Sequence, residues 1–129
     1  MSQFSVALPW PYAALTPNAR EHHFTVARSK KAYRTNCGWE AKAAGLRKLP
    51  PAKLSYQLTF MPPDRKSRDI DNAIASMKSG LDGVADVIGI DDKHWTMEQP
   101  LWGQPTKGGK VLVRFTILTA DVPLRGPIS

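Results

Sequence analysis

The segment "RDIDNAIASMKSGLDGVADVIGIDDKHW" (68–95) carries the clearest structural pattern in the chain. Its large apolar residues recur at intervals of four and three, the spacing of one face of an α-helix. These residues are Ile70, Ile74, Met77, Leu81, Val84 and Ile88. The pattern predicts a helix over residues 70–88 that packs this face into a hydrophobic core. Aspartates flank the pattern, at positions 69 and 71 and at positions 91 and 92.

Strand patterns lie on both sides of this helix. Residues 53–63 alternate between apolar and polar side chains, which predicts a half-buried strand. The apolar positions are Leu54, Tyr56, Leu58 and Phe60. Residues 4–8 form a second predicted strand, and residues 107–118 form a Lys-Gly-Gly turn followed by a long third strand. Residues 94–102 are a candidate for an additional strand.

The remaining segments complete the predicted domain. Residues 30–48 have the composition of a helix that ends at Leu-Pro-Pro, whereas residues 14–30 show no regular period and are predicted to form an ordered loop. The order β-α-β-α-β, with the additional strand, predicts one α+β domain: a mixed or antiparallel sheet of about four strands with two helices. We place this domain at residues 1–118 and expect residues 119–129 to be a loose C-terminal tail.

The amino-acid composition bears on the kind of molecule that the protein binds. The 129 residues contain 18 Lys and Arg against 11 Asp and Glu, which gives a net charge of +7. This excess suits a polyanion, with nucleic acid as the first candidate, although a basic protein without such a partner is the alternative. A single cysteine, Cys37, excludes an internal disulfide and fits a reducing cytoplasm. No apolar run approaches the length of a membrane span, and the N-terminus lacks the pattern of a signal peptide.

The aspartates are unexpected in a basic protein. Two helical residues that are two positions apart point about 200° away from each other, whereas on an extended segment they share a face. Asp69 and Asp71 therefore converge if residues 69–71 are extended just before the helix. Alternatively, Asp71 is simply the N-cap of the helix. Neighbouring carboxylates repel unless they bind a cation, and hard oxygen ligands suit Mg²⁺ or Mn²⁺. A carboxylate-bound metal on a basic surface is what phosphodiester hydrolysis needs.

Four segments of the chain resemble the RusA family of Holliday junction resolvases from bacteria and their phages. They are "LPWP" (8–11), "MPPDRKSRDIDN" (61–72), "LDGVADVIGIDD" (81–92) and "PTKGGKVLVRFTI" (105–117). The Asp-x-Asp-Asn motif followed by an Asp-Asp pair is the most specific part. The resemblance implies a cytoplasmic crossover junction endodeoxyribonuclease of recombination and repair, encoded by a bacterium or a phage. It also implies a homodimer that binds four-way DNA junctions and makes paired, Mg²⁺-dependent nicks, with Mn²⁺ as a substitute. The alternative is a junction-binding protein that has lost cleavage.

The resemblance also implies the site residues. The three essential aspartates of the family fall on Asp69, Asp71 and Asp92, with Asp91 as the neighbouring candidate metal ligand. The family usually carries a catalytic lysine four residues after the second motif aspartate, and that position is Ala75 here.

Lys78 is the nearest lysine that could replace the one missing at position 75. On a continuous helix it lies about 20° around the axis from Asp71 and about 10.5 Å along it, and helical side chains lean back toward the N-terminus. We therefore hypothesise that Lys78 is catalytic. The alternative is an ion pair between Lys78 and Asp82.

Basic clusters supply candidate contacts to the DNA backbone. Those predicted from the sequence are Arg65, Lys66 and Arg68, Lys30, Lys31 and Arg34, and, more weakly, Lys107 and Lys110. Their alternative role is to form ordinary solvated faces. Trp95 follows the aspartates and is a candidate for stacking on an unpaired base. The other three tryptophans are expected in the core or in a dimer interface.

Overall fold

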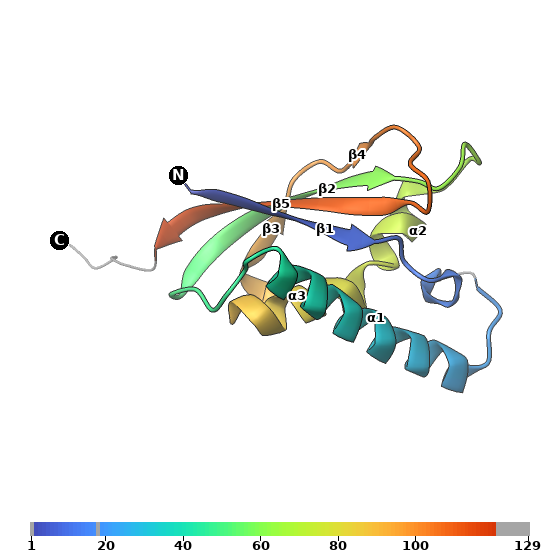
Figure 1. Ribbon diagram of the computed structural model, residues 1–129, viewed down its shortest axis with the longest axis horizontal. Coiled ribbons are helices and arrows are strands. Elements are labelled where there is room, and N and C mark those ends of the chain that lie inside the picture. The colour runs from blue at the N-terminus through green and yellow to red at the C-terminus, as the bar shows by residue number, and fades with distance from the viewer. Residues whose placement is uncertain (1, 18, 121–129) are drawn as a thin grey trace.

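A five-stranded mixed sheet forms the centre of the computed structural model, which describes residues 2–17 and 19–120 (Figure 1). The strand order is β1-β5-β2-β3, and β4 also pairs with β2. Strand β5 is antiparallel to β1 and β2, whereas β3 and β4 run parallel to β2. The strands are β1 (Gln3–Pro9), β2 (Ala52–Met61), β3 (Trp95–Met97), β4 (Leu101–Trp102) and β5 (Lys110–Ala120). The α+β class and the mixed sheet are confirmed, and residues 94–102 contribute two short strands.

Three α-helices and two short 3-10 helices complete the described chain. They are α1 (His23–Ala43), α2 (Ile70–Ala75) and α3 (Lys78–Ile88), with η1 (Ala13–Leu15) and η2 (Asp92–His94). Helices α1 and α3 lie side by side against one face of the sheet (Figure 1). In the part of the chain that the structure describes, no helix is long and apolar enough to cross a membrane.

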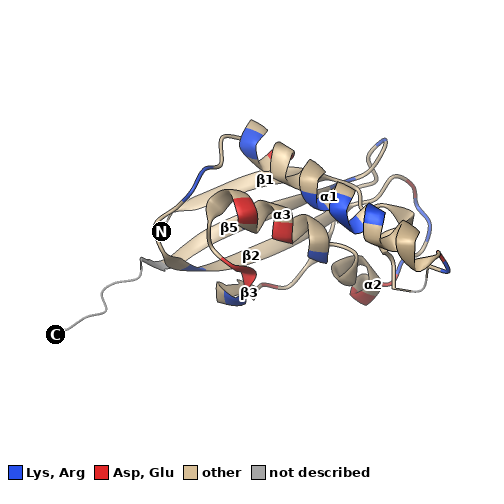
Figure 2. Ribbon diagram, turned by 90° about the horizontal axis from the view of Figure 1, so that it is seen from below, with Lys and Arg blue, Asp and Glu red and all other residues tan. Residues whose placement is uncertain are grey.

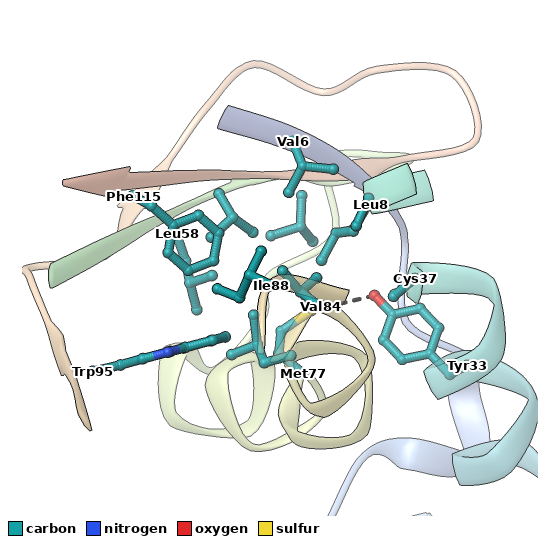
Figure 3. Close-up of a cluster of buried hydrophobic side chains, with 14 of the residues drawn as sticks. Val6, Leu8, Tyr33, Cys37, Leu58, Met77, Val84, Ile88, Trp95 and Phe115 are labelled. Carbon is teal, nitrogen blue, oxygen red and sulfur yellow. Dashed lines mark hydrogen bonds between the residues drawn. The ribbon is translucent and has the colours of Figure 1, made fainter. Parts of the chain in front are cut away.

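The core lies between this helix pair and the sheet. Alternate residues of β2 and β5 pack into this core, as period-two patterning requires, and all of them from Leu54 to Phe60 and from Val111 to Ile117 are fully buried except Tyr56 and Ile117, which are partly buried. Figure 3 shows the side chains of β1, β2 and β5 meeting those of α1 and α3. Tyr33 of α1 lies at the edge of this core, where its hydroxyl donates to the Pro9 carbonyl oxygen at 2.6 Å. The core therefore fixes the relative positions of β1, α1 and α3.

Glycines allow α1 and α3 to pack closely. A Cβ atom added at Gly83 would lie 2.1 Å from the carbonyl oxygen of Arg34, and one added at Gly80 would lie 2.4 Å from the Tyr33 ring. Glycine in a helix costs about 0.5–1 kcal/mol relative to alanine. Here that cost is offset by contact between the helix backbones, which no larger residue permits.

The predicted loop over residues 14–30 is wrong in its second half. Helix α1 begins at His23, and the imidazole of His22 accepts a hydrogen bond from the backbone N–H of Phe24 at 3.2 Å. The helix also ends at Ala43, before the predicted limit of 48. Its buried residues, Tyr33, Cys37 and Ala41, all lie in the C-terminal half. The first turns of α1 pack little against the core, so they carry no apolar period.

The single helix predicted over residues 70–88 is broken into α2 and α3. Ser76 and Met77 form a turn between them. The Ser76 hydroxyl donates to the Ala73 carbonyl oxygen at 2.7 Å, a local bond that competes with the helical pattern. Met77 is fully buried, and its sulfur lies 3.4 Å from the Tyr33 hydroxyl. The apolar spacing continues through the break, which is why it indicated one helix.

The predicted boundary of the tail is two residues too early. Strand β5 continues to Ala120, where it pairs with Ala52, so positions 119 and 120 belong to the sheet. The rest of the predicted tail, residues 121–129, lies outside the described residues.

Candidate functional site

Asp69 caps helix α2. Its backbone is extended (φ −85°, ψ 126°), and its Oδ1 accepts hydrogen bonds from the backbone N–H groups of Asp71 at 2.7 Å and Asn72 at 3.2 Å. Aspartate is well suited to this position because its carboxylate satisfies helical donors that have no partner in the helix. The alternative prediction that Asp71 is the cap is therefore wrong by two residues.

Asp71 lies inside α2 and not on an extended segment. The helix begins at Ile70, so the expectation that residues 69–71 are extended as a unit is wrong. The capping bonds nevertheless draw the Asp69 carboxylate over the backbone of Asp71, and both residues are exposed. The first aspartate motif is therefore an Asx cap at the start of α2 and not an extended strand.

Asp91 and Asp92 form the second acidic segment. Asp91 caps η2, and its bond from the backbone N–H of Lys93, at 3.0 Å, holds the pKa of Asp91 below its usual range. Asp92 Oδ2 accepts a hydrogen bond from Lys78 Nζ at 2.5 Å. Burial raises the pKa of the Tyr56 hydroxyl, and the negative charge of Asp92 raises it further. Tyr56 was not predicted as a site residue, because its strand position explains it as core.

Lys78 bridges two aspartates. Besides Asp92, its ammonium contacts Asp82 Oδ1 at 3.0 Å, so the ion pair expected as the alternative is present. The hydrogen bonds to Asp92 and then to Asp82 raise the pKa of Lys78 above its ordinary value. The predicted alignment of Lys78 with Asp71 assumed a continuous helix, and the turn between α2 and α3 removes its basis. Lys78 instead joins the start of α3 to the second acidic segment.

The carboxylates of the two segments do not gather around one point. Among residues 2–17 and 19–120, no group of three His, Cys, Asp or Glu side chains is placed to hold one metal ion. The types of donor still fit Mg²⁺, which takes one or two protein carboxylates and completes its shell with water and phosphate oxygens. Asp69 and Asp71, two positions apart at the start of α2, are the candidate pair of carboxylates for such a site. Asp69 borders an open hollow of about 430 Å³, together with Trp10, Arg68 and Asn72.

The residues predicted to contact DNA differ in whether their side chains are exposed or held by other residues. Arg65 and Lys66 are exposed in the loop before Asp69. Arg68 is held by Asp64 at 2.8 Å and lies 5.4 Å from the centre of the Trp10 ring. The other predicted contacts are spread over the surface: Lys30, Lys31 and Arg34 on α1, Lys107 in the turn before β5, and Lys110 at its start.

Arg34 is engaged by α3. Its guanidinium makes two hydrogen bonds of 2.8 Å to the carboxylate of Asp86. These bonds raise the pKa of Arg34 and lower that of Asp86. Figure 2 shows basic residues along α1 beside acidic residues on α3.

Trp95 is part of the core. It is 9 % exposed, its indole N–H donates to the Ile90 carbonyl oxygen at 3.2 Å, and its ring packs against Phe115 with centroids 5.0 Å apart. The prediction that it stacks on an unpaired base is therefore wrong. Among the other tryptophans, Trp39 is 64 % exposed, so it does not belong to the core.

The chain is similar in sequence to a protein of Xylella fastidiosa. An uncharacterized protein of Xylella fastidiosa strain Temecula1 is 32 % identical to this chain over 126 residues. The match covers 95 % of this chain and 82 % of the Xylella protein. No family model matches the chain.

Proposed function

The chain belongs to the same family as the Xylella fastidiosa protein, and we propose that it is a RusA-type, Mg²⁺-dependent endodeoxyribonuclease that resolves four-way DNA junctions. The contact of 2.5 Å between Lys78 Nζ and Asp92 Oδ2 carries this proposal. Lys78 follows the short helix that Asp69 caps, and Asp92 ends the second aspartate motif. The contact therefore links the second aspartate motif to the residues that follow the helix of the first motif. The Lys78 ammonium in this contact can bind a phosphate.

Each residue has a definable role in phosphodiester hydrolysis. Asp69 and Asp71 would hold Mg²⁺, which would supply an activated water and stabilisation of the leaving oxygen. The backbone N–H groups of α2 fix the orientation of the Asp69 carboxylate before substrate arrives, which lowers the reorganisation that the reaction requires. Lys78 is protonated across the neutral range, as lysine ordinarily is, and its bonds to Asp92 and Asp82 raise its pKa further, so that its ammonium can stabilise charge on the phosphate.

The charge of the protein supports a DNA substrate. A net charge of +7 favours association with a polyanion, and Arg65 and Lys66 are exposed directly before the Asp69 cap. A four-way junction offers two symmetry-related strands. A homodimer would present two sites about one two-fold axis, which suits paired nicking of such strands. Light scattering should then give a mass near twice 14.3 kDa, about 28.6 kDa.

A junction-binding protein without cleavage is the second candidate. Two observations favour it: position 75 is alanine, and the described carboxylates do not form a group of three. Asp92 would then have a structural role, as the partner that holds Lys78 beside η2. A protein of this kind would bind the junction through its basic surface and would not cleave it.

Nicking of a labelled four-way junction, with and without Mg²⁺, separates these functions. We expect wild-type protein to nick the junction and to leave linear duplex of the same sequence intact. Asp69→Asn, Asp71→Asn and Asp92→Asn should each abolish nicking and leave junction affinity equal or tighter, because less negative charge then faces the phosphates. Asp91→Asn is the matched control and should have the smaller effect. A retarded band without nicking by wild type supports the second candidate, and absence of both rejects the two functions.

A further inference from the structure

We propose that one exposed face of α1 binds single-stranded nucleic acid, with Trp39 stacking on a base. We call this face the α1 stripe; it consists of Phe24, Arg28, Lys31, Thr35, Trp39 and Lys42, all of which are exposed. At 100° per residue these positions fall within a sector of about 80°, and they extend over about 27 Å of helix. The choice of DNA as the nucleic acid rests on the proposed function, which the α1 stripe would extend by a strand-binding surface.

The α1 stripe has the charge that a nucleic acid backbone needs. Arg28, Lys31 and Lys42 are cations, and none of them makes an ion pair with another residue of the described chain. The one acidic residue of α1, Glu40, points about 140° away from the middle of the stripe. Figure 2 shows basic positions along the length of α1. A polyanionic strand laid along α1 therefore meets cations and no carboxylate of this helix.

Trp39 is the feature that selects an unpaired base. It is 64 % exposed, although tryptophan is usually largely buried. The Lys42 ammonium lies 5.1 Å from the centre of its ring, a cation–π contact that keeps one charge beside the indole. Aromatic side chains bordered by cations are the usual elements of surfaces that bind single strands, because every base offers a face for stacking.

Space for a base exists next to Trp39. A hollow of about 430 Å³ between α1 and α3 is bordered by Trp39, Lys31 and Lys42 and by two glycines, Gly38 and Gly83. Its one carboxylate, Asp86, is neutralised by its ion pair with Arg34, which also borders the hollow. At Gly38 and Gly83 the border of this hollow is formed by helix backbone. A flat ring can therefore approach the indole while its phosphates remain near the lysines.

Other polyanionic or apolar partners suit the α1 stripe less well. Its two aromatic residues, Phe24 and Trp39, are 15 positions apart, about 22.5 Å along the helix, with cations between them. A helix that inserts into a bilayer needs a continuous apolar face, which the α1 stripe does not provide. Protein interfaces are depleted in lysine at their centres. A duplex keeps its bases stacked on one another and offers no free ring to Trp39.

Fluorescence anisotropy with a labelled oligodeoxythymidylate of about 12 nucleotides tests whether the α1 stripe binds single strands. This length exceeds the roughly eight phosphates that a B-form strand places along 27 Å. The buffer contains EDTA, so that no cleavage occurs. Trp39→Ala should weaken binding roughly 5- to 150-fold, which corresponds to the loss of one stacked base. Trp39→Phe should retain part of the affinity. Lys31→Ala should reduce the salt slope by about 0.7, whereas Lys53→Ala, an exposed lysine on β2, should change nothing.

Three outcomes would overturn the proposal. They are wild-type affinity in Trp39→Ala, equal affinity for the paired duplex, and Trp39-dependent binding to vesicles that contain phosphatidylserine. Circular dichroism and thermal unfolding should show that Trp39→Ala is folded, because the side chain is exposed. The readout is independent of nicking. Oligonucleotide binding that depends on Trp39, in a protein that nicks no junction, would reject the proposed nuclease and support the α1 stripe. Nicking of the junction together with wild-type oligonucleotide binding by Trp39→Ala would support the proposed nuclease and reject strand binding by the α1 stripe.

Discussion

Replacement of Lys78 by alanine separates a catalytic charge from a structural ion pair. The Lys78 side chain is 66 % exposed, and those of Asp82 and Asp92 are 28 % and 29 % exposed. Ion pairs at such sites contribute about 0.2–1 kcal/mol each, because water screens them. Lys78→Ala should therefore lower the free energy of unfolding by about 1 kcal/mol, a shift of a few degrees in the unfolding temperature.

The expected effect on the reaction is much larger. Loss of a preorganised charge at the reacting phosphate costs on the order of 10²–10³ in rate. Single-turnover nicking at saturating protein measures this rate, and a separate titration measures junction affinity. Asp82→Asn is the matched control, because it removes the pair within α3 and leaves the contact between Lys78 and Asp92. It should cost a few tenths of a kcal/mol in stability and leave the rate within about threefold of wild type.

Three results would contradict this reasoning. The first is nicking by Lys78→Ala within about threefold of wild type, which would make Lys78 a surface charge. The second is an equal loss of rate in Asp82→Asn and Lys78→Ala, which would mean that the order of α3 and not the ammonium itself controls the reaction. A loss of stability well above 1 kcal/mol in Lys78→Ala would also contradict the screening assumed here.

Three further predictions concern packing, pH and salt. Gly83→Ala should destabilise the protein by about 1–3 kcal/mol in chemical denaturation, since its Cβ would overlap a carbonyl oxygen of α1. Gly38→Ala should destabilise it less, because its Cβ would lie 3.4 Å from the Gly83 carbonyl oxygen. Equal losses of stability in the two variants would contradict close helix packing. Burial raises the pKa of Cys37 from 9.0 to about 12, so above pH 9 the unfolded chain binds fewer protons and the free energy of unfolding should fall with rising pH; a Cys37→Ala variant with the same slope would refute this origin. Junction affinity should fall about 10³–10⁵-fold between 50 and 200 mM salt, and Arg65→Ala with Lys66→Ala should flatten that dependence, whereas an unchanged salt slope would place the DNA elsewhere.

The sheet and the core could be predicted because their patterns are local. The strands predicted within residues 53–63 and 107–118 are present, and the second part of the apolar stripe, Met77, Leu81, Val84 and Ile88, is buried as expected, whereas Ile70 and Ile74 are partly buried. The break at Ser76 and Met77 could not be predicted in this way. A turn of two residues preserves which side chains face the core, so the spacing is the same with one helix or two. The early start of α1 was missed for the opposite reason, because its first turns bury few apolar side chains.

The candidate site was predicted in residue types and not in geometry. The motif located Asp69 and Asp71, but only the hydrogen bonds show that Asp69 is the cap. The contact of Lys78 with Asp92 spans 14 positions and depends on the direction of the chain after α3. Gly89 ends that helix with a left-handed backbone (φ 73°), and the following acidic segment then lies along the same open hollow as Asp82. No spacing rule within a helix predicts a contact that forms across its end.

The alanine at position 75 offers a test of what Lys78 contributes. Ala75 is exposed at the end of α2 and borders the same hollow as Lys78. It lies one helical turn after Asp71, about 6 Å along the axis, in the order of charges that favours an acid followed by a base. Ala75→Lys would therefore place an ammonium beside Asp71, at the position where the resemblance expects it.

In the Lys78→Ala background, Ala75→Lys should raise the nicking rate at least tenfold above that of Lys78→Ala if the missing element is positive charge near the phosphate. The restored rate should also no longer depend on Asp82. If Lys78 acts by holding Asp92 in place, the new ammonium cannot replace it, and the rate should stay at the level of Lys78→Ala. Rescue would assign the role to charge, whereas failure in a folded double variant would assign it to the contact between Lys78 and Asp92 and would contradict the electrostatic role proposed for this lysine.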